Sequence, residues 1–235
     1  MVKNKNIVCI VQARLNSSRL PGKILKKINK KNIVLEFLIK RLKKSKKISK
    51  IIIACPDTNE DKKIIKKLKK YKVNLFQGSK LNVLDRYFKA AKKFKANVII
   101  RITSDCPFSD PKLIDKFLEI FLKFKYDYFS NINPPTFPDG FDVEIFNFKS
   151  LKFAWENANS NYDKEHVTPY LKKSNKINRG NFSLKQDYSK LRVTLDNQND
   201  LKLIRHIAKE LNPNKYFSWK KILGKLKKLQ KNEIK

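Results

Sequence analysis

The chain is poor in glycine and cysteine, and each shortage excludes a class of protein. It has only five glycines, and neither the GxGxxG pattern of dinucleotide-binding folds nor the GxxxxGK[ST] pattern of P-loop proteins is present. A serine-hydrolase elbow and a metalloprotease helix motif are missing as well. The three cysteines, Cys9, Cys55 and Cys106, lie far apart without a CxxC pair. We therefore expect no disulfide framework, core thiols at Cys9 and Cys55, and a cytoplasmic location.

Long apolar runs are also missing. No run approaches the length of about 18 residues that a transmembrane helix requires. Residues 1–6 lead directly into a short apolar segment and lack the apolar core of a signal peptide. We therefore expect a protein that does not insert into a membrane.

Acidic residues are scarce relative to basic ones: 21 Asp and Glu stand against 55 Lys and Arg, which gives a net charge of +34. Such a charge attracts polyanions, so a basic nucleic-acid-binding module is one hypothesis to keep. The lysines are spread over nearly every predicted helix, as in the pairs Lys62–Lys63 and Lys66–Lys67. This even distribution indicates a general lysine bias, and we expect no specific nucleic-acid partner.

What the chain does have is a cluster of cations directly after its first apolar segment. Ile7–Val11 is typical of a buried strand, and Arg14, Arg19 and Lys23 follow it, with a Pro-Gly turn at residues 21 and 22. The chain has only eight arginines, so two within six residues stand out against the lysine bias. Arginine offers a bidentate fork to phosphate and lysine adds a point charge. The alternative is a solvated basic loop.

The first half of the chain alternates between strand and helix patterns. Short β-branched runs predict strands at 7–11, 51–54, 73–76 and 98–102, and helical patterns cover 33–45, 59–70, 82–95 and 110–124, where Asp110 is the expected N-cap. Such alternation is typical of an α/β fold with a mostly parallel, Rossmann-like sheet covered on both faces. Ligands bind such sheets at the carboxyl edge of the strands, where the arginine-lysine loop begins.

The second half is less regular. A proline-rich loop is predicted over 131–140, followed by an alternating strand at 141–146 and a strand near 191–195. Helices are predicted at 149–158, 163–172, 198–211 and 218–231, the last of them amphipathic and packed against the core.

The cationic loop resembles a known family. Ala13-Arg14, Ser18-Arg19, Pro21 and Lys23 match the signature of the cytidylyltransferases that make CMP-activated sugars, in particular the branch named after the spore coat polysaccharide protein SpsF. The CMP-acylneuraminate and CMP-3-deoxy-manno-octulosonate synthetases are related to it. The resemblance implies a glycosyltransferase-A-like nucleotidyltransferase fold over 1–235, with a nucleotide-binding half at 1–130 and an acceptor and dimerisation half at 131–235. It also implies CTP as the nucleotide and a homodimer.

The same resemblance assigns roles to residues of this loop and of a later segment. The nucleotide-binding residues would be Gln12, Ala13, Arg14, Ser18, Arg19 and Lys23, of which Arg14, Arg19 and Lys23 would act catalytically on the triphosphate. Gly78–Tyr87 matches the family segment that borders the cytosine and ribose, and Arg86 is its candidate contact. The alternative for Arg86 is a surface pair with Asp85.

Two aspartates are candidate metal ligands. Asp105 follows the strand predicted at 98–102, which places it at the same sheet edge as the cationic loop, and carboxylates of this kind hold Mg²⁺ together with substrate phosphates. The resemblance makes Asp105 and Asp196 the two protein ligands of Mg²⁺. The alternative for Asp105 is a turn-capping residue. Asp200 is expected in the first turn of a helix.

Two further patches, 138–144 and 164–170, match SpsF-like segments in the half of the family fold that binds the acceptor sugar. Their acceptor-binding candidates are Asp139, Asp142, Glu144, Glu165 and His166. The resemblance thus predicts transfer of CMP from CTP to a sugar or sugar acid for surface polysaccharide biosynthesis. A glycosyltransferase of related fold is an alternative, but it would carry a D-x-D motif where this chain has Ser104-Asp105-Cys106.

Overall fold

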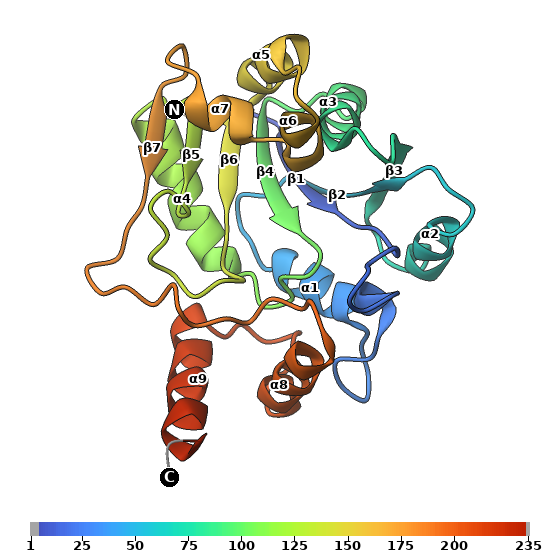
Figure 1. Ribbon diagram of the computed structural model, residues 1–235, viewed down its shortest axis with the longest axis vertical. Coiled ribbons are helices and arrows are strands. Elements are labelled where there is room, and N and C mark those ends of the chain that lie inside the picture. The colour runs from blue at the N-terminus through green and yellow to red at the C-terminus, as the bar shows by residue number, and fades with distance from the viewer. Residues whose placement is uncertain (1–4, 234–235) are drawn as a thin grey trace.

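The computed structural model describes residues 5–233 and contains a seven-stranded sheet with helices on both faces (Figure 1). The strand order is β3-β2-β1-β4-β6-β5-β7. The strands are β1 (Ile7–Gln12), β2 (Lys50–Pro56), β3 (Asn74–Gly78), β4 (Val98–Thr103), β5 (Tyr128–Ser130), β6 (Glu144–Asn147) and β7 (Arg179–Asn181). Only β6 runs antiparallel to its neighbours, so the predicted α/β fold with a mostly parallel sheet is confirmed.

The central strands end level with one another, which determines where a site can form. In the parallel register, Gln12 at the end of β1 lies beside Ala54 of β2 and Thr103 of β4. The chain leaves β1 and β4 at the same edge, into the loops that carry the cationic cluster and Asp105. This edge is where open α/β sheets bind their ligands.

Two hydrophobic cores cover the two faces of the sheet. Side chains alternate along β1, so that Cys9 and Val11 enter one core while Val8 and Ile10 enter the other. The first core includes residues of α1 (Val34–Leu42), α2 (Lys62–Leu68), α4 (Pro111–Lys123), α8 (Gln198–Lys209) and α9 (Trp219–Glu233). The second core includes residues of α3 (Val83–Lys93), α5 (Phe148–Asn157) and α7 (Pro169–Lys173), with α6 (Asn161–His166) between the last two.

Several helix starts follow the rules of N-capping. Asp110 is the N-cap of α4, where its Oδ1 accepts hydrogen bonds from the backbone N–H groups of Lys112 and Leu113, as the sequence predicts. Asn197 caps α8, and Asp200 in its first turn accepts from the backbone of Asn197 in return. In Figure 1, α8 and α9 lie beyond the end of the sheet toward which the β4 arrow points.

Three predicted elements of the second half are wrong in detail. Residues 191–195 form no strand and make only one isolated bridge, between Arg192 and Asp139, while the strand predicted over 141–146 covers Glu144–Asn147. The predicted helix 163–172 is broken in two because Val167 adopts a left-handed φ of 70° between α6 and α7. The sequence also missed β7, a three-residue edge strand whose pairing with β5 is long-range.

None of the helices described between residues 5 and 233 is long and apolar enough to cross a membrane. All three cysteines are buried and free, as predicted for Cys9 and Cys55. The N-terminal residues 1–4, on which the signal-peptide prediction partly rests, and residues 234–235 of the predicted domain lie outside the described part of the chain.

Candidate active site

A cleft of about 220 Å³, which we call the central cleft, opens at the carboxyl ends of β1 and β4. It collects most of the residues that the sequence singles out. Its lining comprises Gln12, Ala13, Arg14, Asn16, Ser17, Ser18, Arg19, Lys23, Lys80, Val83, Arg86, Thr103, Ser104, Asp105, Glu165, His166 and Asp196. Segments separated by more than 180 residues in the chain thus meet at one edge of the sheet.

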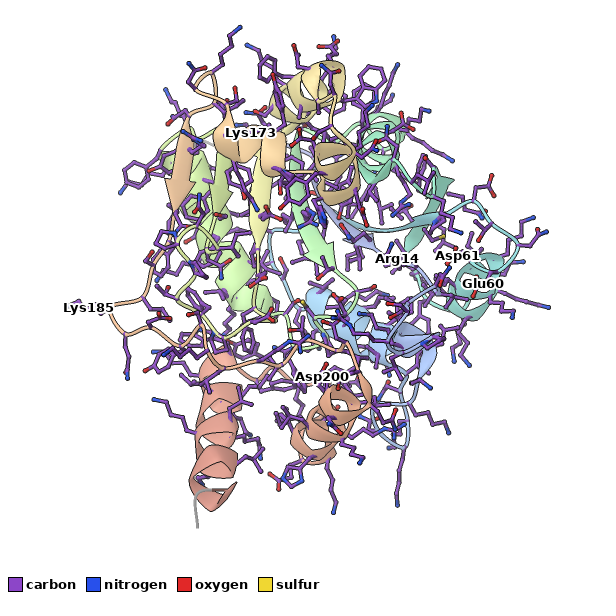
Figure 2. All side chains as sticks on the ribbon, viewed as in Figure 1. Arg14, Glu60, Asp61, Lys173, Lys185 and Asp200 are labelled. Carbon is purple, nitrogen blue, oxygen red and sulfur yellow. The ribbon has the colours of Figure 1, made fainter. Side chains whose placement is uncertain are left out.

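The loop after β1 is held in shape by its own backbone and by α2. Gly22 donates from its backbone N–H to the Leu15 carbonyl (2.9 Å) and adopts a left-handed φ of 66°, which closes the predicted Pro-Gly turn. The backbone N–H of Leu15 donates to Oδ1 of the buried Asp61 at 2.8 Å. Figure 2 shows Arg14 and Asp61 near each other at this junction. Asp61 is a structural anchor that sequence reasoning missed.

Lys23 joins the two predicted metal ligands. Its Nζ donates to Asp105 Oδ2 and to Asp196 Oδ1, each at 2.9 Å. The backbone N–H of Leu195 also donates to the Asp105 carbonyl at 2.8 Å, which ties the loop before α8 to the loop after β4. Two carboxylates from distant segments therefore converge on one cation.

The charges at this point stabilise one another. Burial lowers the pKa of the Lys23 ammonium, but Asp105 and Asp196 outweigh that effect and raise it overall. Burial raises the pKa of Asp196, whereas the hydrogen bond and charge of Lys23, followed by the charges of Arg192 and Arg19, lower it overall. Both groups are therefore charged at neutral pH.

Arg192 contacts three carboxylates, a role that the sequence did not predict. Its guanidinium donates from Nε to Asp139 Oδ2 (3.1 Å), from Nη1 to Asp200 Oδ1 (3.4 Å) and from Nη2 to Asp196 Oδ2. Arg19 Nη2 lies 3.0 Å from the same Asp196 oxygen. The spacing of Arg192 four residues before Asp196 was the available signal. It was obscured because this segment was interpreted as a strand, in which the two side chains would not meet.

The first turn of α3 forms another wall. Asn82, its N-cap, accepts from the backbone N–H of Asp85 at 2.9 Å. This start brings Val83 and Arg86 to the central cleft. Arg86 is buried and donates from Nη1 to the Ser79 carbonyl at 2.5 Å. The alternative of a surface pair is wrong for Arg86, because Asp85 instead pairs with Lys89 and with the Trp155 indole.

Glu165 and His166, at the end of α6, also line the central cleft. The His166 ring lies 4.6 Å from the ring of Tyr162, which is 64% exposed. The break at Val167 ends α6 here, so these two side chains stand at the rim of the cleft.

Glu144, by contrast, lies in the interior among polar partners and does not line the central cleft. Tyr128 and Thr168 donate hydroxyl hydrogen bonds to its Oε1, each at 2.6 Å, and Lys172 Nζ lies at 3.2 Å. Arg101 pairs with its other oxygen. Burial raises the pKa of Glu144, but Arg101 and Lys172 outweigh this and bring it to about 2. The carboxylate is therefore ionised and fully engaged within the fold.

Asp139 and Asp142 do not line the central cleft. Asp139 is occupied by Arg192 and by Thr194, whose hydroxyl donates to Asp139 Oδ2 at 2.7 Å. Burial raises the pKa of Asp142 to about 7, with further contributions from the neighbouring carboxylates of Asp139 and Glu144. Asp142 is thus a carboxyl that gains or loses a proton near neutral pH.

The donor set fits a divalent cation shared with a substrate. No group of three or more His, Cys, Asp or Glu side chains suited to a metal occurs among residues 5–233. The carboxylates of Asp105 and Asp196 already hold the Lys23 ammonium between them. Mg²⁺ characteristically takes one or two carboxylates together with phosphate oxygens and water. A site of this kind can position a polyphosphate and neutralise its charge.

Comparisons with known proteins agree with this geometry. A family model described as cytidylyltransferase matches residues 8–232. The chain is 31% identical to the spore coat polysaccharide biosynthesis protein SpsF of Bacillus subtilis, covering 85% of each protein. It is also 39% identical to an uncharacterized protein of Methanocaldococcus jannaschii, covering 88% of this chain and 84% of the relative.

Among solved structures, a cytidylyltransferase from Leptospira borgpetersenii superimposes with a TM-score of 0.91 at 30% identity. The match covers 97% of this chain and 96% of that one. This chain and that cytidylyltransferase therefore share one fold over nearly their whole lengths.

Proposed function

Since the chain belongs to the cytidylyltransferase family and is a CTP-using nucleotidyltransferase, we propose that it transfers CMP from CTP to a hydroxyl of a sugar or sugar acid. The acceptor oxygen attacks the α-phosphorus of CTP. The bond between the α-phosphorus and the oxygen that bridges the α- and β-phosphates breaks, and pyrophosphate leaves. The observation that carries this proposal is the convergence of Lys23, Asp105, Asp196 and Arg19 at one end of the central cleft.

Phosphoryl transfer of this kind depends on positioning and charge neutralisation more than on covalent catalysis. Arg14, Arg19 and Lys23 would hold the β- and γ-phosphates and stabilise the pyrophosphate as it departs. Arg14 and Arg19 line the cleft from a loop fixed at both ends, so little loop ordering is needed on binding. Ala13 and Ser18 would line the same nucleotide subsite, and Arg86 would border the nucleoside.

Asp105 and Asp196 would hold Mg²⁺, which when bound supplies charge neutralisation to the phosphates. The same two carboxylates contact Lys23. We therefore expect the Lys23 ammonium to leave them for phosphate oxygens when they hold a divalent ion. Arg192 would keep Asp196 in place through this change, because it also contacts Asp139 and Asp200.

The acceptor would enter over the rim formed by Glu165 and His166, with Asp139 and Asp142 as further candidate contacts. We assign no general base, because Asp142, whose pKa is about 7, does not line the central cleft. We propose a supporting role for Glu144, which holds Lys172 and Thr168. The name of the SpsF relative favours a sugar of surface polysaccharide biosynthesis as the acceptor.

We also propose that the chain is one domain with a nucleotide half at 1–130 and an acceptor half at 131–235, and that it works as a cytoplasmic homodimer. Support for the two halves comes from the cleft, to which residues up to Asp105 bring the phosphate and nucleoside groups, while Glu165, His166 and Asp196 close it. Light scattering after size exclusion would test the dimer.

Pyrophosphate release measured across the four NTPs, with Mg²⁺ and a panel of sugars and sugar acids, tests the proposal. We expect release with CTP and one acceptor class, and loss of it in Asp105→Asn and Asp196→Asn. Thermal unfolding supplies a readout independent of turnover: CTP should raise the Tm with Mg²⁺, and EDTA should remove most of that gain. Equal stabilisation with and without Mg²⁺ would contradict the metal assignment.

A further inference from the structure

Two buried polar atoms in the lining of the central cleft have no hydrogen-bond partner among the described residues. They are Oε1 of Gln12, an acceptor, and Nε of Arg86, a donor. Buried polar groups in folded proteins are satisfied in the great majority of cases, because an unpaired one costs free energy. An unpaired acceptor and an unpaired donor in one cleft are therefore typical of a surface that a polar ligand completes.

The sheet directs the Gln12 side chain toward α3. Side chains alternate along β1, and Val8 and Ile10 both enter the core shared with α3, so Gln12 continues the same face one position past the core. The Tyr87 hydroxyl donates to the Ile10 carbonyl at 3.2 Å, which fixes α3 directly over β1. The Gln12 amide thus faces the first turn of α3, where Val83 and Arg86 also line the cleft.

This arrangement suits one flat heterocycle. Cytosine carries an exocyclic 4-amino donor beside the N3 and O2 acceptors. A protein that binds this edge therefore needs an acceptor opposite the amino group and a donor opposite N3 or O2. Gln12 Oε1 supplies the acceptor, the remaining end of the amide or Arg86 supplies the donor, and Val83 supplies apolar contact. The selection requires the amide to be held with Oε1 toward the base, because its other end, Nε2, would donate a hydrogen bond to a 4-oxo group.

We propose that Gln12 selects the nucleobase by accepting a hydrogen bond from the 4-amino group of cytosine. This inference rests on the proposed use of CTP and adds the residue that distinguishes CTP from UTP. Uracil has a 4-oxo acceptor in place of the amino donor and would leave Gln12 Oε1 buried against a second acceptor. A site built to hydrogen-bond a donor rejects an analogue that lacks it more strongly than an apolar pocket could.

The test is a cycle in which the amide and the amino group are removed one at a time. Calorimetry compares the binding of CTP, dCTP, UTP and the triphosphate of 2-pyrimidinone riboside, which lacks the 4-amino group. Wild type, Gln12→Met and Gln12→Glu are measured with Mg²⁺ and without acceptor. Methionine keeps the length of the side chain and loses the acceptor, whereas glutamate keeps an acceptor. Ser18→Ala is the matched control, because Ser18 lines the cleft on the phosphate loop.

We expect wild type to bind CTP at least roughly tenfold more tightly than the analogue without the amino group. In Gln12→Met that ratio should fall to within about twofold, while Gln12→Glu and Ser18→Ala should keep the preference for the amino group. An unchanged ratio in Gln12→Met, with CTP still bound, would overturn the inference and leave the proposed function intact.

Two further outcomes would also count against it. If Gln12→Met removed the difference between CTP and dCTP rather than the amino-group difference, Gln12 would contact the ribose, and the inference would be wrong. Absence of CTP binding by the wild type would overturn the proposed function, and the inference with it.

Discussion

A single ammonium group, that of Lys23, lies within hydrogen-bond distance of carboxylates that are 82 and 173 residues away in the chain. Its side chain is 11% exposed, and it is surrounded by groups that need its charge. At this scale, the chemistry depends on which cation the two carboxylates hold. The arginines differ from Lys23, because their planar forks can bind one phosphate group through two parallel hydrogen bonds.

Substituting Arg19 tests the geometry of the phosphate contact separately from its charge. Arg19→Lys keeps the charge and loses the bidentate fork. We therefore expect kcat/KM for CTP to fall, by an amount equivalent to a loss of about 2 kcal/mol or more of transition-state stabilisation. Arg205→Lys, outside the central cleft, is the matched control and should stay near wild type. A near wild-type kcat/KM for Arg19→Lys would indicate that the loop is only a basic surface.

The carboxyl group of Asp142 makes the free energy of unfolding depend on pH. Its pKa is raised to about 7 in the folded state by burial and by the carboxylates of Asp139 and Glu144, against the attraction of Arg101 and Lys172. The folded state therefore holds the proton more tightly than the unfolded state does. Stability from this group is fully present below the unfolded pKa and is lost as pH rises through about 7.

We therefore expect Asp142→Asn to be more stable than wild type at pH 8, by about 4 kcal/mol, and close to it near pH 4. Urea unfolding of both proteins across this range measures the difference. Because all other titrating groups are shared, the gap between the two curves isolates Asp142. A gap that is constant with pH would contradict the raised pKa.

At the scale of elements, the first half of the chain was predictable because each element is specified locally. β-Branched runs such as Val98–Ile102 and capped helices such as α4 carry their own signals, and the sheet edge they imply places Arg14, Lys23 and Asp105 together. The second half depends on long-range contacts. β7 is specified by pairing with β5, and the break at Val167 requires a φ of 70° that a β-branched residue does not signal in advance.

The segment 191–195 shows the same limit at the active site. Its alternating pattern is typical of a strand, yet it is held by the loop at 138–141 rather than by a sheet. The backbone N–H of Asp139 donates to the Leu191 carbonyl, and that of Val193 donates to the Asp139 carbonyl. Arg192 and Asp196 meet as a consequence of these long-range contacts, which the strand-like pattern of the segment conceals.

Gly140 makes the contact between the loop 138–141 and the segment 191–195 possible, so a substitution there tests that contact. It adopts a φ of 109°, and a Cβ there would lie 2.9 Å from Val193 Cγ2 and 3.1 Å from the Thr194 backbone nitrogen. We expect Gly140→Ala to lower the free energy of unfolding by at least about 2 kcal/mol and to lower kcat through displacement of Arg192 and Asp196.

Gly224→Ala is the matched control for that substitution. Gly224 lies in α9 with nothing within 4 Å of an added Cβ, so alanine there should stabilise the protein by up to about 1 kcal/mol. Urea unfolding and kcat measured on both variants give the comparison. Loss of stability without any change in kcat for Gly140→Ala would separate the loop contact from the active site.

At the scale of the whole molecule, the net charge of +34 must have consequences beyond the central cleft. A hollow of about 960 Å³ between the loop 27–32 and α8, which we call the basic hollow, shares no residue with that cleft. Basic residues line it and no carboxylate does: they are Lys27, Lys30, Lys31, Lys40, Arg205, His206 and Lys209. The lining contains no Phe, Tyr or Trp on which a base could stack, so a polyanion would be held there mainly by charge.

We therefore expect nonspecific binding of single-stranded oligonucleotides that fades as salt approaches about 150 mM, because counterion release drives it. Changing Lys30, Lys31 and Lys209 together to Gln should reduce the slope of log K against log salt by about 2, at roughly 0.7 per phosphate contact. The same change at Lys63, Lys66 and Lys67, exposed on α2, is the matched control and should alter the slope much less.

The same assay separates the enzyme from a nucleic-acid-binding module. Asp105→Asn with Asp196→Asn should abolish pyrophosphate release, because Mg²⁺ loses its hard oxygen ligands, while oligonucleotide binding persists since the basic hollow is untouched. One preparation of the double variant assayed both ways gives the comparison. Sequence-specific RNA binding that survives about 150 mM salt, together with no CTP turnover by the wild type on any sugar acid, would show that the positive charge serves the function and that the central cleft does not.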